Sequence, residues 1–358
     1  MNGALPTMTE RRWRLGLYGL TLVVFVGAWF LLGIFSATTL SVLVLALYYA
    51  IAGSSFNFLY GSVGLFSIAQ PVFIAVGGFT DVYLYNHFDL SPWISILVAM
   101  VVAAVLAIPI ALIMLSREGT VLTALVTLIV AQAVPAIVAA IKGLGGAQGL
   151  QENALPGSSL AKMQFNSGLP FARILLVVNV VIIFGLMLFK QSRLGYWCTA
   201  VKDSAVAAEA CGLAARRLRL MVFVLSAVIA APAGVVYAQY TLAATTDVFL
   251  AATTLFEVLV VALVGGWSRP WGAVVGAIAM SELSFHLTNA FPNRAGVSAL
   301  AFGIAFLAVA LIIPRGVSGA WEARPAWLRW GGPDRVSSVV GSAPVASDGA
   351  HDAPREHV

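Results

Sequence analysis

Three acidic residues lie within long apolar stretches of the sequence, where a charged group is costly and therefore marks a candidate functional position. Glu257 is the deepest, whereas Asp81 and Glu282 lie nearer the ends of their stretches and are expected to reach headgroups or water. A charge at the middle of an apolar helix costs about 2.5 to 3.5 kcal/mol on insertion scales. For Glu257 two interpretations stay open: a structural pairing or inter-subunit contact, and a direct role in solute passage or gating.

A serine in a nucleophile-like pattern is a second candidate. Gly316-Val-Ser-Gly319 matches the Gly-x-Ser-Gly pattern of membrane serine proteases, which would need a histidine base beside Ser318. His87 and His286 flank apolar stretches, but the predicted topology places both on the side of the membrane opposite Ser318. No Ser-His pair can form in that topology, so no catalytic residue is predicted.

Motifs for nucleotide and metal binding are absent from the sequence. Without a Gly-x-x-x-x-Gly-Lys-Ser/Thr phosphate loop, the chain is not expected to bind ATP by the usual means. Cys198 and Cys211 are expected in one cytoplasmic loop, where thiols stay reduced, which predicts neither a disulfide nor a metal site. The net charge of +5 is explained by loops that meet anionic lipid and a protein partner, so no nucleic-acid partner is predicted.

The elements that hold these residues are predicted to be membrane-spanning helices. The chain is 60% hydrophobic and only 10% charged, with a mean hydropathy of +0.95, and a soluble domain of this size cannot bury that much apolar surface. The apolar runs are long enough to cross a hydrocarbon core of about 30 Å, and barrel-type alternation is absent. We therefore predict an all-α integral membrane protein, a bundle of about ten transmembrane helices.

The apolar runs predict the positions of these spans. They are 15–36, 38–60, 66–86, 92–115, 121–141, 171–190, 219–241, 252–267, 270–288 and 296–314. The predicted number of spans is eight to ten, because the span at 252–267 is short enough to be partly re-entrant. Before residue 320, twelve basic residues are predicted on one side of the membrane. Four are predicted on the other side: Lys142, Lys162, Arg173 and Arg294. Since short cytoplasmic loops collect lysine and arginine, both termini are predicted to be cytoplasmic.

This topology divides the chain into three parts. Residues 1–14 form a cytoplasmic N-terminus, residues 15–315 form the transmembrane domain, and residues 316–358 are predicted to be a disordered cytoplasmic tail, because they are rich in Gly, Ser, Pro and Asp. Within the domain, an external loop covers 142–170 and is large enough for a docking or gating surface. A cytoplasmic loop covers 191–219.

The cytoplasmic loop predicts a short docking helix. Asp203 is placed to cap it, the alanine-rich run from Ser204 to Cys211 favours a helix, and Gly212 supplies a left-handed stop. Small residues would allow close approach to a groove in another protein, with Lys202 and Glu209 as polar contacts. An ordinary amphipathic surface helix explains the same pattern, and both interpretations stay open.

Glycine and amide residues mark a second segment, in and beside the second and third spans. The glycines are Gly61, Gly64, Gly77 and Gly78. They permit close helix approach or local unwinding along a path, although plain helix packing explains them as well. Asn57 and Gln70 have the chemistry to hydrogen-bond a polar solute, or to form interhelical bonds.

Several stretches resemble the permease subunits of branched-chain amino-acid (LIV-type) ABC importers. Gly195–Gly212 resembles the cytoplasmic coupling loop of that family, with a basic-acidic pair, Ala-Ala-Glu and a closing glycine. Four other stretches are similar to parts of the same family. Leu59–Phe73 with Gly77–Thr80 resembles its Gly-rich segment between the second and third helices, and Gly143–Leu150 resembles its external Gly-Gly-x-x-Gly-Leu loop. Val264–Ala273 resembles its late cytoplasmic turn, and Phe223–Ser226 with Ala233-Gly234 resembles the helix after the coupling loop.

The resemblance implies roles for particular residues. An ATPase subunit would contact Lys202, Asp203, Ala208, Glu209, Ala210 and Gly212. The pathway or its gate would be lined or shaped by Asn57, Gly61, Gly64, Ser67, Gln70 and Gly77, with Glu257 as a further candidate. This chain would bind no cofactor, because ATP and Mg would be held by the partner ATPase.

The resemblance also implies partners, a location and a mechanism. The chain would be a multi-pass protein of the bacterial cytoplasmic (inner) membrane, paired with a second permease subunit, ABC ATPase subunits and an extracytoplasmic solute-binding protein. It would move a small polar solute by alternating access. The solute stays open between a branched-chain amino acid, a related amino acid, an amide and a urea-like compound, since Ala69-Gln70-Pro71 departs from the family's common Gly-His-Ala. An ion-coupled secondary transporter is the alternative, although it would need no coupling loop.

Overall fold

The computed structural model describes residues 23, 25–115, 120–152, 160–266, 270–290, 300, 303, 304 and 316. The chain divides into two units, Met1–Glu322 and Ala323–Val358, and every described residue belongs to the first. The predicted N-terminal segment 1–14 and, apart from Gly316, the predicted tail 316–358 lie outside the described residues. Ser318 lies outside them too.

Helices make up most of the described chain. The long ones are α2 (Ala37–Val63), α3 (Gln70–Phe88), α4 (Pro92–Met114), α5 (Thr120–Ala140), α6 (Gly168–Gln191), α9 (Ala215–Thr241), α11 (Ala252–Gly265) and α12 (Gly272–Ala290). The short ones are α7 (Arg193–Asp203), α8 (Ala205–Ala210), α10 (Thr246–Phe249) and the 3-10 turns η1 (Lys142–Leu144) and η2 (Gly146–Gln148). The strands β1 (Leu150–Gln151) and β2 (Ala243–Ala244) pair antiparallel, with Leu150 opposite Ala244, a pair that the sequence pattern did not predict.

Six helical stretches among the described residues are long and apolar enough to cross a membrane. They are Ala37–Val63, Pro92–Met114, Leu122–Ala140, Gly168–Gln191, Ala215–Thr241 and Thr246–Gly265. α3 and α12 occupy the predicted spans 66–86 and 270–288 but are not among the six. The predicted spans 15–36 and 296–314 lie mostly outside the described residues. The helical architecture is confirmed, whereas the number of ten spans and the side of each terminus stay predictions.

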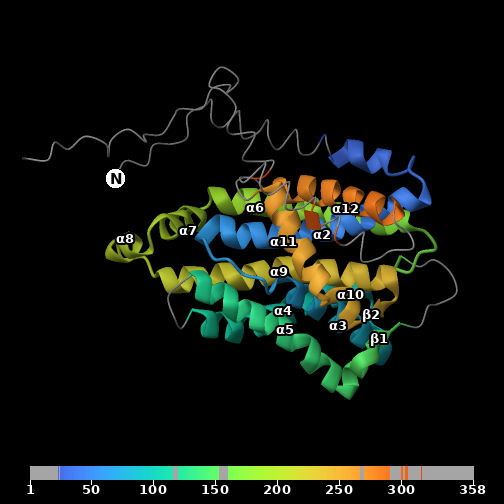
Figure 1. Ribbon diagram of the computed structural model, residues 1–358, viewed down its shortest axis with the longest axis horizontal. Helices are drawn as coiled ribbons and strands as arrows, with labels where there is room; N and C mark the ends of the chain where they lie inside the picture. The colour runs from blue at the N-terminus through green and yellow to red at the C-terminus, as the bar shows by residue number, and fades with distance from the viewer. Residues whose placement is uncertain are drawn as a thin grey trace, which may run out of the picture. The chain divides into compact units, whose positions relative to one another are not determined.

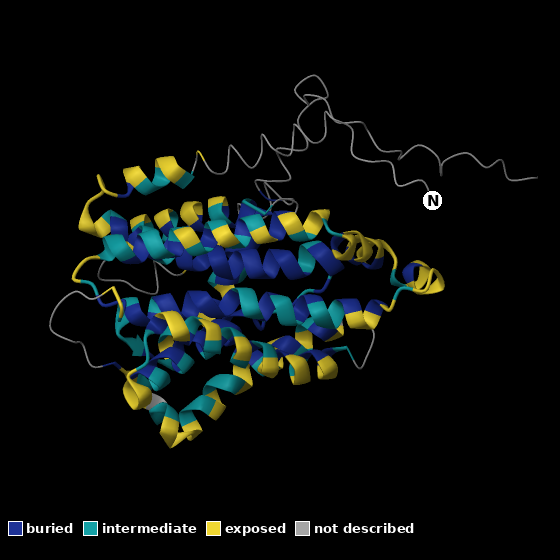
Figure 2. Cartoon of the chain, turned by 180° about the vertical axis from the view of Figure 1, so that it is seen from behind, coloured by how far each residue is buried: buried dark blue, intermediate teal, exposed yellow. Residues whose placement is uncertain are grey.

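α2 lies at the centre of the helices. It packs against α6, α9, α11 and α12, while α9 also packs along α3 and α4 (Figure 1). Most of α2 is buried, whereas only 22% of the apolar window of α4 and of α5 is buried, and both helices carry many exposed apolar side chains (Figure 2). An exposed apolar helix is stable only where lipid or another apolar surface covers it, so α4 and α5 have the character of an outer, membrane-facing layer.

α3 and α9 approach each other closely because glycines remove side chains from their contact. A Cβ added at Gly77 would collide with the carbonyl oxygen of Ala231, and one added at Gly234 would collide with that of Ile74. Gly77 therefore serves helix packing, which is one of the two interpretations that its position allowed. Since protein covers most of α3, this helix carries buried polar residues that a lipid-facing helix would not.

The two long connecting segments lie at opposite ends of the helices. α7 and α8 stand at one end, and β1 and β2 stand at the other (Figure 1). α6 and α9 run between these ends. This arrangement agrees with loops 142–170 and 191–219 lying on opposite sides of a membrane.

Candidate functional site

The segment between α6 and α9 folds as two helices rather than one. α7 ends at Asp203, and Ser204 is extended (φ −157°, ψ 108°) before α8 begins. The Ser204 hydroxyl accepts a hydrogen bond from the backbone N–H of Ala207 at 3.2 Å, so Ser204 caps α8. The predicted cap, Asp203, was wrong by one residue, because Asp and Ser are both good caps and the chain breaks after Asp203. The predicted stop is confirmed, since Gly212 has φ +85°.

α8 stands at the end of the bundle, and most of its surface is exposed (Figure 1). Of the six residues that the resemblance assigned to an ATPase contact, Ala208 is buried, and the other five are exposed: Lys202, Asp203, Glu209, Ala210 and Gly212. Val206, which was not predicted, is 81% exposed. On α7, Tyr196 and Trp197 are exposed as well.

The exposed side chains of α7 and α8 are candidates for contact with a partner protein, and we call four of them together the docking face. We define it by Tyr196, Trp197, Val206 and Glu209. Exposed aromatic and aliphatic side chains beside polar ones are typical of protein interfaces. The sequence carried a signal for these two residues, because Tyr196 and Trp197 are the only aromatic residues of the loop 191–219.

Lys202 connects α7 to the C-terminal end of α2. Its ammonium group donates a hydrogen bond to the carbonyl oxygen of Gly61, in the last turn of α2, at 3.0 Å. It also lies 5.9 Å from the centre of the Tyr60 ring. Desolvation lowers the pKa of Lys202, and the charge of Asp203 acts in the opposite direction. A cation at a helix C-terminus is favourable, so this contact ties α7 to α2, while an ATPase contact of Lys202 stays a prediction.

Gln70 lies in a buried polar contact among three helices. Its Oε1 atom is 2.7 Å from the Ser55 hydroxyl of α2, and its Nε2 atom donates to the Ser226 hydroxyl of α9 at 3.4 Å. Gln70 and Ser67 are both fully buried, and the Ser67 hydroxyl accepts from the backbone N–H of Ala69 at 3.2 Å. Interhelical bonding therefore accounts for Gln70, and Ser67 shapes the first turn before α3.

The other pathway candidates on α2 lie near its C-terminal end. Asn57 is buried and donates from Nδ2 to the carbonyl oxygen of Gly266 at 3.1 Å, which links α2 to the end of α11. Gly64 ends α2 with φ +71°, and the carbonyl of Gly61 accepts from Lys202. The structure gives each of these residues a packing or capping contact, and their part in a pathway stays a prediction.

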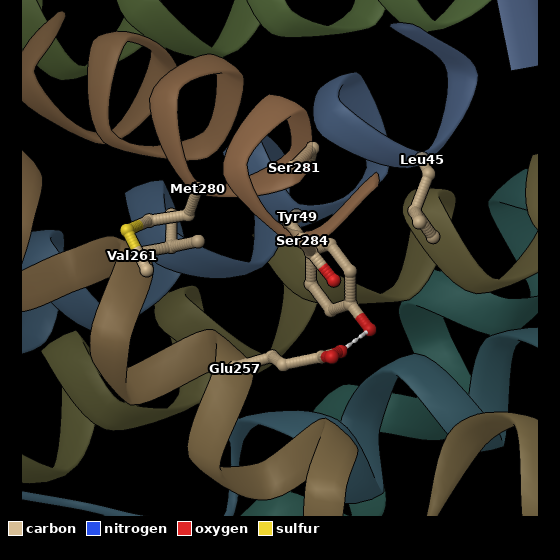
Figure 3. Close-up of a pocket in the computed structure, with 7 residues that line it drawn as sticks. All are labelled: Leu45, Tyr49, Glu257, Val261, Met280, Ser281 and Ser284. Carbon is tan, nitrogen blue, oxygen red and sulfur yellow. Dashed lines mark hydrogen bonds between the residues drawn. The ribbon is translucent and has the colours of Figure 1, made fainter. Parts of the chain in front are cut away.

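Glu257 lies in a pocket between α2, α11 and α12. The pocket is lined by Leu45, Tyr49, Glu257, Val261, Met280, Ser281 and Ser284 (Figure 3). The Tyr49 hydroxyl points at Glu257 and donates a hydrogen bond to its Oε2 atom. The pocket is partly open, and the space within it is about 20 Å³, room for about one water molecule. None of the other six predicted pathway residues lines this pocket, so the structure separates Glu257 from them.

At the opposite end of the bundle, Asp81 is fully buried. The Nε2 atom of Gln239 on α9 donates to Asp81 Oδ2 at 2.7 Å and to Glu152 Oε2 at 2.6 Å. The expectation that Asp81 reaches headgroups or water was therefore wrong, because Gln239 of α9 and Glu152 of the loop 142–170 cover it. We call this loop the external segment, after its predicted position. Glu282, by contrast, is exposed and lies 3.3 Å from His286.

Glu152 holds the external segment onto this end. Its Oε1 atom accepts from Gln164 Nε2 at 2.8 Å, and Gln164 also reaches the Tyr85 hydroxyl at 3.3 Å. Burial raises the pKa of Glu152 to about 7, helped by the nearby charge of Asp81 and opposed mainly by the hydrogen bonds from Gln164 and Gln239. We call Asp81, Glu152, Gln164 and Gln239 the external cluster. Its last three members were missed, because only the fold brings them beside Asp81.

Metal binding finds no support in the described part of the chain, where no group of three or more His, Cys, Asp or Glu side chains is placed to hold an ion. Cys198 is buried, Cys211 is exposed, and both are free thiols.

Comparison with known proteins identifies the family. The family model described as the branched-chain amino acid transport system permease component matches residues 38–313. The chain belongs to this family. The predicted resemblance is thereby confirmed, as is the prediction of a transport subunit rather than an enzyme. A multi-pass membrane protein also follows, because the family match and the apolar helices agree.

Two curated relatives belong to the same group of permeases. The "high-affinity branched-chain amino acid transport system permease protein LivM" of Escherichia coli (strain K12) is 25% identical, over 68% of this chain and 62% of its own length. The "probable branched-chain amino acid transport permease protein LivH" of Methanocaldococcus jannaschii is 25% identical, over 72% of this chain and 84% of its own length. The match thus spans less than two thirds of LivM. No solved structure matches the chain significantly.

Proposed function

We propose that the chain is the permease subunit of an ATP-driven importer and moves a small polar solute across the bacterial cytoplasmic (inner) membrane. Its solute would be a branched-chain amino acid, a related amino acid, an amide or a urea-like compound. The observation that carries this proposal is the docking face on α7 and α8, within a chain of this permease family.

The partners follow from the same proposal. An ABC ATPase subunit, which holds ATP and Mg, docks on α8, and a second permease subunit completes the membrane pathway. An extracytoplasmic solute-binding protein delivers the solute to the end of the bundle that carries β1 and β2. Lipid covers the exposed apolar helices.

The mechanism we propose is alternating access. Closure of the ATPase subunits displaces α8, and Lys202 carries the movement from α7 to the end of α2. Since α2 lies at the centre of the bundle, its displacement repacks α6, α9, α11 and α12 around it.

Co-purification tests the proposal. The tagged chain is purified from its own membranes as wild type, Val206→Arg and Glu209→Arg, since both positions lie on the docking face and a new positive charge there opposes docking without touching the core. An ATPase subunit is expected to copurify with wild type and to be lost, by about tenfold or more, from both variants.

Leu160→Arg is the matched control, because Leu160 is 74% exposed in the external segment, at the opposite end. It should retain the ATPase. A wild-type chain that purifies without any ATPase and still transports by itself would instead establish the ion-coupled secondary transporter.

A further inference from the structure

The lining of the Glu257 pocket combines one carboxylate with hydroxyl groups and an aliphatic wall. α2 contributes Leu45 and Tyr49, α11 contributes Glu257 and Val261, and α12 contributes Met280, Ser281 and Ser284 (Figure 3). The three apolar side chains fit the hydrocarbon part of a ligand. The carboxylate and the hydroxyls fit a group that donates hydrogen bonds.

No lysine or arginine in the described part of the chain forms a salt bridge with Glu257. Tyr49 is its hydrogen-bond partner there. Glu257 is only partly buried, so its carboxylate is open to a group from outside the chain. An intramembrane carboxylate without a cation is costly, and a cation that enters the pocket would remove that cost.

Ser281 gives a second, independent indication of a ligand. Its side chain is only 6% exposed, it lines the pocket, and its hydroxyl oxygen is buried without a hydrogen-bond partner in the described structure. Buried hydroxyls are normally satisfied, so this atom has capacity for a group that enters the pocket.

The size of the pocket limits which chemical group of a ligand can enter it. The pocket is partly open, and the space within it, about 20 Å³, admits a head the size of a water molecule, while the rest of the ligand extends past the aliphatic side chains of the lining. A primary ammonium group has this size, carries the positive charge that would offset the carboxylate of Glu257, and donates three hydrogen bonds, for which the carboxylate and the hydroxyls of the lining are suitable acceptors.

We propose that the Glu257 pocket receives the ammonium head of an amine-bearing aliphatic solute, with Leu45, Val261 and Met280 in contact with its hydrocarbon part. The assignment rests on the proposed function, because it takes the pocket as a station of the transported solute. It favours amino compounds over the neutral amides and urea-like compounds, which bring no charge to offset the carboxylate.

Thiol labelling of the purified full-length chain tests the pocket directly. Ser284→Cys, in a Cys198→Ala/Cys211→Ala background, is reacted with the cationic 2-aminoethyl and the anionic 2-sulfonatoethyl methanethiosulfonates. The ratio of their rates is divided by the ratio at the exposed Cys211 of a chain with Cys198→Ala alone. We expect the cationic reagent to be favoured by at least about tenfold, and isopentylamine, but not 3-methyl-1-butanol, to slow the reaction.

Variants assign these effects to the carboxylate. Glu257→Gln should abolish the charge preference and the protection by isopentylamine, whereas Glu257→Asp should keep both, which excludes misfolding as the cause. Glu282→Gln, which removes an exposed carboxylate of α12 outside the pocket, should change neither. Equal normalised rates, equal protection by amine and alcohol, or a cysteine that reacts with neither reagent would each overturn the proposal.

The labelling requires no ATPase. A chain that keeps the cation preference but copurifies with no ATPase would therefore refute the importer and leave the pocket assignment standing.

Discussion

At the scale of single residues, the external cluster shows how one side chain can serve two helices. Gln239 donates both of its amide hydrogens, one to Asp81 of α3 and one to Glu152 of the external segment. Neither carboxylate has a salt-bridge partner in the described structure. Because burial without a cation disfavours the charged carboxylate, Glu152 binds a proton more readily when the external segment is docked, and this protonation helps to hold the segment in place.

Glu152 makes the docking of the external segment depend on pH. Its pKa is raised from 4.5 to about 7 in the folded chain, so the folded state binds this proton more tightly than the open state does. The stabilisation is complete below about pH 4.5 and is lost as the pH rises through about 7.

Hydrogen exchange at the backbone amides of Leu150 and Glu152, which lie on the hydrogen-bonded side of the strand pair, should be slower at pH 5 than at pH 8 after correction for the intrinsic pH dependence. Glu152→Gln should remove most of this difference, because a glutamine stays neutral at both pH values. An unchanged pH dependence in Glu152→Gln would show that another group is responsible.

Lys202 offers a second test at this scale. Lys202→Met removes the hydrogen bond to Gly61 and keeps most of the aliphatic length, so it should lower stability by only about 1 kcal/mol. In the assembled importer, ATP hydrolysis should continue while transport per ATP falls severalfold, because α7 no longer holds α2. The comparison is Lys202→Arg, which keeps a cation there. Equal losses of hydrolysis and transport would place Lys202 in the ATPase contact instead.

At the scale of elements, the contact between α3 and α9 depends on the absence of side chains. Gly77→Ala places a Cβ against the carbonyl oxygen of Ala231, so it should destabilise the chain by about 1 to 3 kcal/mol. Gly185→Ala in α6 is the matched control, because nothing lies within 4 Å of the added atom, and it should be neutral or slightly stabilising. Thermal unfolding in detergent measures both. A neutral Gly77→Ala would show that the two helices separate without cost.

The sequence predicted helices better than the contacts between them. The helix near Ala205–Ala210 and its stop at Gly212 were predictable, because alanine and glycine act locally through backbone preferences. The burial of Asp81 was not, because it depends on Gln239, 158 positions away. The Glu257 pocket was equally invisible, since α2, α11 and α12 come together only in the fold, although the carboxylate itself stood out in its apolar stretch.

At the scale of the whole molecule, the separation of the two connecting segments predicts opposite labelling from the two sides of the membrane. Cys211 is exposed at the end with α8, while burial raises the pKa of the Cys198 thiol to about 11, so only Cys211 should react near neutral pH. In intact cells an impermeant maleimide should label Leu160→Cys in a Cys211→Ala chain at once. Native Cys211 should react only after the cells are permeabilised, and the reverse pattern would invert the predicted topology.

The length and continuity of α9 determine how movement passes between the two connecting segments. It begins at Ala215, a few residues after α8 ends, and it stops at Thr241, directly before β2, which pairs with β1. At 1.5 Å per residue its 27 residues measure about 40 Å, more than the thickness of a hydrocarbon core. Pro232 removes one backbone hydrogen bond within it and leaves the rest continuous. One continuous helix thus joins the two connecting segments, so a displacement at one end is transmitted to the other, and Pro232 is the position where the helix bends most easily.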